Sequence, residues 1–231
     1  MSRIGASEFL QVIRPALAAR DAVALAEAVH AHWTLADLVD LLDHESSDVR
    51  SAAAITLGVA GDMSCSAALT KALRDEASQV NEMAEHGLWM IWFRNCCTEA
   101  AAPFQSGVAL LALERYRQAI DRFESAARLD RQFAEAHNQR AIALHLLGQW
   151  SESIDACRDT IRLVPTHFGA IAGMGHGYVR LGSLQDALRC YRTALKINPH
   201  LQCIRTAAGT IESGHHDPEA GGFAEATRWQ A

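Results

Sequence analysis

Three consecutive windows of equal length align without a gap, and this internal period restricts the possible folds more than any other feature of the chain. The windows are residues 100–133, 134–167 and 168–201. A period of this length is typical of a pair of helices that is repeated along a stack, because one pair cannot bury its apolar face by itself. We therefore expect a helical solenoid.

Within each window, a small residue on the first helix is matched by a larger residue on the second helix of the pair. The eighth position holds Gly107, Ala141 and Gly175, and the twenty-fourth position holds the larger Phe123, Cys157 and Tyr191. Small residues allow two antiparallel helices to approach closely, and larger residues fill the space between successive pairs. This pattern predicts close packing at the centre of every pair.

Glycine and proline mark the predicted helix ends. Gly148 and Gly182 stand between the two helices of the second and third windows, where a residue with positive φ ends the first helix. Pro165 and Pro199 follow the second helices of the same windows, and proline cannot continue a helix. The turns therefore recur with the same period as the helices.

These residues resemble the tetratricopeptide repeat (TPR) family from residue 100 to about residue 201. The third window is closest to the family pattern, with Gly175, Tyr178, Gly182, Ala187, Tyr191, Ala194 and Pro199. The first window departs from it at Pro103, where the family often has tryptophan, at Glu114 in the turn, and at Arg131 in place of proline. The resemblance implies three stacked helix pairs, followed by a helix over residues 202–212 that covers the last pair.

The N-terminal part repeats with a different and shorter period. Four apolar positions recur in it, Leu42, Val49, Ala53 and Leu57 as Leu73, Val80, Ala84 and Leu88. Each repeat is interpreted as an apolar helix, a short polar turn, and a second helix that opens with Asp48-Val49-Arg50 or Gln79-Val80-Asn81. This pattern resembles HEAT repeats, especially the short bacterial kind that phycobilisome lyases also contain.

Residues before this repeat are also expected to be helical. Thr34, followed three residues later by Asp37, resembles a capping box at a helix start, with Asp in place of the usual Glu or Gln. Apolar residues at helical spacing within residues 7–32 predict a further helix pair.

The predicted fold class is therefore all-α, a right-handed solenoid of HEAT-like helix pairs followed by three TPR helix pairs and a capping helix. The predicted domains are residues 1–98 and 99–212, and residues 213–231 are expected to be a mostly disordered tail. Charge follows the same division, with a net −6 over residues 1–98, +2 over residues 99–212 and −2 over the tail.

Composition excludes several classes of function. A formal net charge of −6 argues against a nucleic-acid-binding protein, which needs a surplus of Lys and Arg. The densest apolar run, residues 88–93, is far shorter than the ~20 residues that span a bilayer. The six cysteines include no CxxC motif, and the N-terminus lacks a secretion signal, so we expect a cytoplasmic protein with reduced thiols.

No pattern of metal ligands or catalytic residues stands out, and neither a cofactor nor a metal is predicted. None of the eleven histidines has HExxH spacing, and the chain is not expected to be an enzyme. The adjacent thiols of Cys96 and Cys97 follow the aromatic residues Trp89, Trp92 and Phe93; a nucleophilic thiol would need a base and exposure. We interpret these aromatic residues as a buried seam that joins the two solenoids.

The TPR resemblance implies a concave groove lined by the first helix of each pair. The residues predicted to bind protein there are Gln105, Asn138, Gln139, Ile142, His145, Gly169, Gly173, His176 and Arg180. Asn138 and Gln139 carry donors and acceptors for the main chain of an extended peptide, and Arg180 is suited to a carboxylate. Gly169 and Gly173 allow two interpretations, a groove kept open for a ligand or close packing against a neighbouring helix.

One subgroup of the family grips the C-terminal carboxylate of heat-shock chaperones with Lys, Asn and Arg side chains. At those positions this chain has Phe104, Val108, Gln139, Gly169 and Gly173. No cation remains there, so a chaperone-tail partner of that type is not expected.

The predicted function is a non-catalytic scaffold or adaptor that binds a peptide or helix of another protein in the concave groove. Its expected partners are proteins, without nucleic acid and without membrane insertion. The alternative is an accessory maturation factor or lyase-like enzyme that acts through the HEAT-like part. Metal or chromophore retained by the purified protein would favour this alternative.

Overall fold

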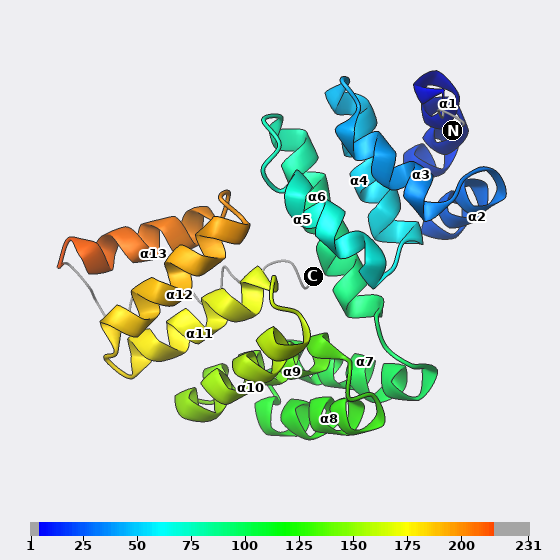
Figure 1. Cartoon of the computed structure of the whole chain (residues 1–231). Coiled ribbons are helices and arrows are strands. Elements are labelled where there is room, and N and C mark those ends of the chain that lie inside the picture. The colour runs from blue at the N-terminus through cyan, green and yellow to red at the C-terminus, as the bar shows by residue number, and fades with distance from the viewer. Residues whose placement is uncertain (1–4, 215–231) are drawn as a thin grey trace. The chain divides into compact units, whose positions relative to one another are not determined.

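The computed structural model describes residues 5–214, and every regular element in this range is helical (Figure 1). The prediction of an all-α solenoid of helix pairs is confirmed. The chain divides into two compact units, one up to Asn95 and one from Cys96, which we call unit 1 and unit 2 and describe separately.

Unit 1 consists of α-helices of different lengths and two short 3-10 helices. Its elements are α1 (Ala6–Ala19), α2 (Ala22–His32), α3 (Leu35–Asp40), η1 (Leu41–Asp43), α4 (Ser47–Ala60), η2 (Met63–Cys65), α5 (Ser66–Ala72) and α6 (Ser78–Arg94). The long helices α4 and α6 begin at equivalent positions of the two sequence repeats, as predicted. Thr34 and Asp37 form the expected capping box at the start of α3. The likeness to HEAT repeats stays a prediction.

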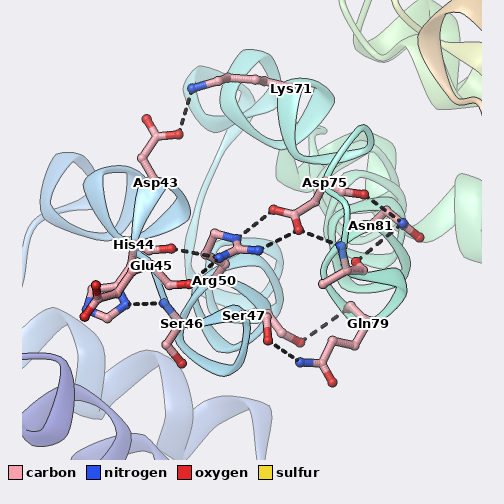
Figure 2. Close-up of polar contacts among 12 residues, drawn as sticks. Asp43, His44, Glu45, Ser46, Ser47, Arg50, Lys71, Asp75, Gln79 and Asn81 are labelled. Atoms are coloured by element: carbon pink, nitrogen blue, oxygen red, sulfur yellow. Dashed lines mark hydrogen bonds and ion pairs between the residues drawn. The ribbon is translucent and has the colours of Figure 1, made fainter.

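An ion pair connects the turns that precede α4 and α6 (Figure 2). Arg50 donates through Nε to Asp75 Oδ2 over 2.7 Å and through Nη2 to Asp75 Oδ1 over 2.8 Å. Its Nη1 donates to the carbonyl oxygens of His44 and Glu45, both at 2.9 Å. These side-chain hydrogen bonds hold the pKa of the Asp75 carboxyl below its usual range. Because the guanidinium bonds to both turns, it fixes their spacing.

Asn81 occupies the position of Arg50 in the next repeat, and its shorter side chain reaches less far. Its amide nitrogen is 3.4 Å from the carbonyl oxygen of Asp75 and 3.5 Å from that of Ala77, both in the turn that precedes its own helix (Figure 2). The side chain at the second opening therefore closes its own turn rather than joining two turns.

The backbones of α4 and α6 are in contact where the two helices cross. A Cβ atom at Gly58 would lie 2.5 Å from the Cα atom of Gly87, and a Cβ atom at Gly87 would lie 2.9 Å from the carbonyl oxygen of Ala54. Glycine is required at this crossing, because a side chain would push the helices apart.

The aromatic residues near the end of α6 pack edge to face. The ring centroids of Trp89 and Trp92 are 5.1 Å apart, and those of Trp89 and Phe93 are 6.4 Å apart. Trp92 is 1% exposed, which agrees with a core position. The expected role of this cluster as a seam that joins the two solenoids stays a prediction.

Unit 2 consists of three helix pairs and one further helix. The pairs are α7 (Thr98–Ala112) with α8 (Tyr116–Leu129), α9 (Ala134–Leu146) with α10 (Trp150–Leu163), and α11 (Phe168–Arg180) with α12 (Leu184–Ile197), followed by α13 (Gln202–Glu212). The second helices begin at the same position of each window, and two of them end just before Pro165 and Pro199, as predicted. Each second helix packs on the first helix of its own pair and on the next one, and α13 packs on α12 in the same way.

The eighth position of each window is the point of closest approach within a pair. A Cβ atom at Gly107 would lie 2.6 Å from the ring of Phe123, and one at Gly175 would lie 2.5 Å from the ring of Tyr191. In the second pair the alanine Ala141 belongs to the same buried cluster as the smaller Cys157. Where the eighth residue is larger, its partner on the second helix is smaller, so all three pairs pack closely with different residues.

Glu114 adopts the left-handed conformation that glycine supplies in the other two pairs. Its φ is +58°, against +81° for Gly148 and +74° for Gly182. The backbone closes the turn with the same hydrogen bonds, from Glu114 N–H to Leu111 O and from Arg115 N–H to Leu110 O, each at 2.9 Å. The stacked pairs impose this conformation on a residue that disfavours it by about 1–2 kcal/mol.

Replacing Glu114 with glycine should stabilise the protein. We expect the free energy of unfolding to rise by about 0.5–1 kcal/mol, because glycine removes the steric strain but is more flexible when unfolded. Urea denaturation of the purified protein measures this change. Glu114→Ala is the control, since it keeps the Cβ atom and should give no gain; an equal gain for both would contradict strain as the cause.

Candidate protein-binding face

The residues predicted to bind protein lie on the first helices of the three pairs, which we call together the first-helix face. In this face α9 lies between α7 and α11 and contacts both. Gln105 lies on α7; four residues lie on α9, namely Asn138, Gln139, Ile142 and His145; and four lie on α11, namely Gly169, Gly173, His176 and Arg180.

A buried carboxylate outside the predicted set organises the start of α9. Glu135 is 0% exposed, and its Oε1 accepts hydrogen bonds from Asn138 Nδ2 at 2.9 Å and Gln139 Nε2 at 2.7 Å. Its Oε2 is 3.0 Å from Nε2 of His167, the residue that precedes α11. His167 Nδ1 accepts from the backbone N–H of Ala170, so Nε2 carries the hydrogen and donates to Glu135. Three donors thus surround one carboxylate.

This network corrects the expectation for the two amides. Asn138 and Gln139 are 3% and 0% exposed, and their amide nitrogens are used by Glu135 rather than presented on an open surface. The spacing of the three residues, at i, i+3 and i+4 on one helix, is the sequence signal that predicts this arrangement. Ile142 and His176 are also buried, at 9% and 5% exposure.

Gln139 keeps one unused hydrogen-bonding atom. Its side-chain oxygen Oε1 is buried and accepts no hydrogen bond from the described residues. A buried acceptor without a donor costs about 1–3 kcal/mol, so a ligand that brought a donor to this oxygen would regain that free energy.

Two histidines and an arginine lie close together on α9 and α11. Burial lowers the pKa of His145 to about 4, with a further contribution from the positive charge of Arg180. Burial lowers the pKa of His176 to about 3, and His145 contributes to that shift. His176 Nδ1 also lies 2.8 Å from the hydroxyl of Tyr191. Both histidines are therefore neutral at pH 7.

Arg180 carries the positive charge at the end of this face. It is exposed, and its guanidinium carbon lies 4.7 Å from the ring centroid of Trp150. Stacking on an aromatic ring keeps a guanidinium in a defined position while its edge can still bind an anion. Gln105 is also exposed, whereas His145, Gly169 and Gly173 are half-buried.

The glycines of α11 separate into two kinds. A Cβ atom at Gly175 would lie 2.5 Å from Tyr191, and one at Gly177 would lie 2.7 Å from Ile154, so both are required for packing. A Cβ atom at Gly173 would meet only Cys157 Sγ, at an ordinary 3.5 Å. Close packing therefore explains Gly175 and Gly177, but it does not explain Gly173.

The thiols at the start of unit 2 show no sign of activation. Burial raises the pKa of the Cys96 thiol, with a smaller contribution from Asp130. The backbone N–H of Cys97 donates to Asp130 Oδ2 over 2.8 Å. The six cysteines all lie within residues 5–214 and form no disulfide there; Cys65, Cys157 and Cys190 are buried and the other three are half-buried.

Residues 5–214 contain neither a metal-ligand cluster nor a helix that could cross a membrane. Between residues 5 and 214, no three His, Cys, Asp or Glu side chains come together in an arrangement that could hold a metal ion. Over the same residues, no helix has the length and apolar composition needed to cross a membrane.

A family model described as tetratricopeptide repeat matches residues 104–167, which include all of the second helix pair and most of the first. A TPR repeat-containing protein of Rhizobium etli is 30% identical over 90 residues, covering 38% of this chain. The match covers 44% of that relative, so the chain spans less than half of its length.

Two solved structures of TPR proteins resemble the fold weakly. The first TPR of Spaghetti (RPAP3), bound to an HSP90 peptide, is 19% identical with a TM-score of 0.49, over 51% of this chain and 93% of that one. YrrB, described as a TPR protein with an unusual peptide-binding site, is 19% identical with a TM-score of 0.47, over 89% of this chain and 100% of that one. The repeat assignment rests on the family model and the helix pairs, not on these similarities.

Removing the charge of Glu135 should destabilise unit 2. In Glu135→Gln, one carboxylate oxygen is replaced by an NH₂ group, which cannot accept a hydrogen bond, so at least one of the three donors loses its acceptor. We therefore expect the free energy of unfolding to fall by about 1–3 kcal/mol. Urea denaturation measures the loss. Glu152→Gln, at an exposed position on α10, is the matched control and should change stability by less than about 0.5 kcal/mol. Equal effects of the two variants would contradict the role of the network.

Stability should fall as pH is lowered from 7 to 5. In this range His145 and His176 stay neutral in the folded protein, whereas in the unfolded chain they bind protons near pH 6.5. The unfolded state therefore binds more protons, and each histidine contributes up to about 1.4 kcal/mol of lost stability per pH unit. Urea midpoints measured across this range should show a shallower decline for His176→Gln. An unchanged slope in that variant would contradict the assignment to His176.

Proposed function

We propose that the chain is a non-catalytic scaffold that holds a peptide or helix of a partner protein on the first-helix face of unit 2. The TPR match to residues 104–167 supports a role in protein interaction, since stacked helix pairs present extended binding surfaces.

This proposal rests on the equivalent positions of Gln139 and Gly173 on two neighbouring helices. Both residues stand at the sixth position of their windows, on the neighbouring helices α9 and α11. Within the described part of the chain, Gln139 has a buried oxygen that accepts no hydrogen bond, and a Cβ atom at Gly173 would make only an ordinary contact with Cys157. An extended peptide fits these two features together, since one of its side chains would pack over the small Gly173, and its main-chain N–H would donate to Gln139 once the side chains that cover this oxygen move aside.

The chemistry of the partner follows from the rest of the face. Arg180 is suited to an acidic side chain, and Gln105 offers an amide on α7. The positions of the chaperone-tail clamp hold no cation, and one of them, Phe104, is buried with its ring centroid 4.6 Å from that of Phe133. We propose that the partner segment is acidic and internal rather than held by a terminal carboxylate.

Filling the space at Gly173 should prevent binding without unfolding the protein. Partners captured by the wild-type protein are identified, and synthetic peptides that cover them are tested for binding by fluorescence anisotropy. Gly173→Leu should weaken the best peptide at least ~10-fold, a loss of about 1.4 kcal/mol. Its melting temperature should not fall, because leucine has a better helix propensity than glycine. Arg180→Glu should weaken acidic peptides, more so at low salt.

Gly209→Leu on α13 is the matched control. A Cβ atom there meets nothing within 4 Å among the described residues. This variant therefore makes the same Gly-to-Leu substitution at an exposed position of a helix outside the first-helix face. It should bind as the wild type does. A stable Gly173→Leu protein that binds every peptide normally would exclude this face as the binding site.

A further inference from the structure

The C-terminal segment, residues 215–231, lies outside the described residues, but its sequence has a composition unlike that of the repeats. It carries two large aromatic side chains, Phe223 and Trp229, among small residues, with Asp217, Glu219, Glu225 and Arg228 as its only Lys, Arg, Asp or Glu residues. Its net charge is −2, opposite to the net +2 of residues 99–212. An acidic segment matches the acidic partner argued above for the first-helix face, and its two aromatic side chains can serve as apolar anchors.

The place where the chain leaves the repeats lies close to this face. Because α13 packs on α12 as α11 packs on α10, it takes the place of the first helix of a fourth pair. Its C-terminal end, closed by Gly214 with a φ of +72°, therefore lies at the same edge as the ends of α9 and α11. That edge carries exposed apolar side chains, with Leu146 41% exposed and Leu181 44% exposed.

The segment is long enough to cross the face. Neighbouring helices pack about 8–10 Å apart, so the row from α13 to α7 spans roughly 30 Å. Seventeen extended residues reach about 56 Å at ~3.3 Å per residue. The first aromatic anchor, Phe223, comes nine residues after Gly214, at a reach of about 30 Å.

We propose that the C-terminal segment binds the first-helix face of its own chain and competes there with the partner peptide. The acidic residues of the segment are attracted by Arg180, and an aromatic side chain packs over the small Gly173. This inference rests on the proposed function, because it assigns a regulator to the same face. A partner must displace the segment, so its apparent affinity is lower in the full chain than for an unoccupied face.

The first test uses a fluorescein-labelled synthetic peptide with the sequence of residues 215–231 and full-length protein. A double variant, Phe223→Ser with Trp229→Ser, removes both anchors from the chain's own segment. This variant should bind the labelled peptide saturably, and the wild type should bind it at least ~10-fold more weakly, because its own segment is present at roughly millimolar effective concentration. Adding Gly173→Leu to the double variant should abolish binding, and adding Gly209→Leu should not. A labelled peptide with both aromatic residues changed to serine should not bind.

The second test measures amide hydrogen exchange in the full-length proteins. Loss of the two anchors should speed exchange in α9 and α11 by roughly five- to tenfold, because a bound segment suppresses local opening, while α8 should not change. The absence of peptide binding together with unchanged exchange would overturn the inference. Protection of α9 and α11 that decreases on dilution of the wild type would also overturn it, because the segment would then come from a second copy.

Failure of this inference and failure of the proposed function give different results. If partner peptides bind the wild type and the double variant equally, and Gly173→Leu weakens both, the face binds partners and the segment does not regulate it. If Gly173→Leu affects neither partner peptides nor the labelled segment, the face itself is excluded.

Discussion

Close approach of the two helices at the centre of each pair is the constraint on which unit 2 depends. At Gly107 and Gly175 an aromatic ring lies where a Cβ atom would otherwise be, and the middle pair reaches the same closeness with Ala141 beside Cys157. Small residues on one helix and their partners on the other must therefore change together, because an alanine opposite a tyrosine would force the axes apart. The stacking of successive pairs, and with it the first-helix face, follows from this spacing.

Much of this fold could be predicted from periodicity, because period reports which residues share a helix face. The three equal windows identified the three pairs, and the prolines at 165 and 199 identified two helix ends. Periodicity contains no information about the partner of a polar side chain. Glu135 binds His167, which directly precedes the first helix of the next pair, and Asn138 and Gln139 donate to the same carboxylate. The predicted binding residues lie on the first helices of the pairs, but two of them, Asn138 and Gln139, are buried.

Backbone conformation shows a similar limit. The sequence marks Glu114 as a departure from the glycine of the other turns, which suggests a different local structure. The chain instead adopts the same left-handed turn there. The helices before and after the turn, α7 and α8, pack on each other, and this packing fixes the path of the turn between them. In unit 1 the replacement of Arg50 by Asn81 has the opposite outcome, since the shorter amide reaches only the turn before its own helix. Tertiary packing preserves a backbone shape more readily than it preserves a specific side-chain bond.

The link between Glu135 and His167 has a consequence for how the array unfolds. In a repeat array, stability is approximately the sum of the intrinsic stability of each repeat and of its interaction with its neighbours, so a strong contact at one junction couples the two repeats that share it. Here the second repeat holds a buried carboxylate whose third donor sits at the entrance to the third repeat. Opening that junction would leave the carboxyl group of Glu135 with one hydrogen-bond donor fewer. The two repeats are thus expected to act as a single cooperative block, with the nearest-neighbour coupling concentrated at one junction rather than spread evenly along the stack.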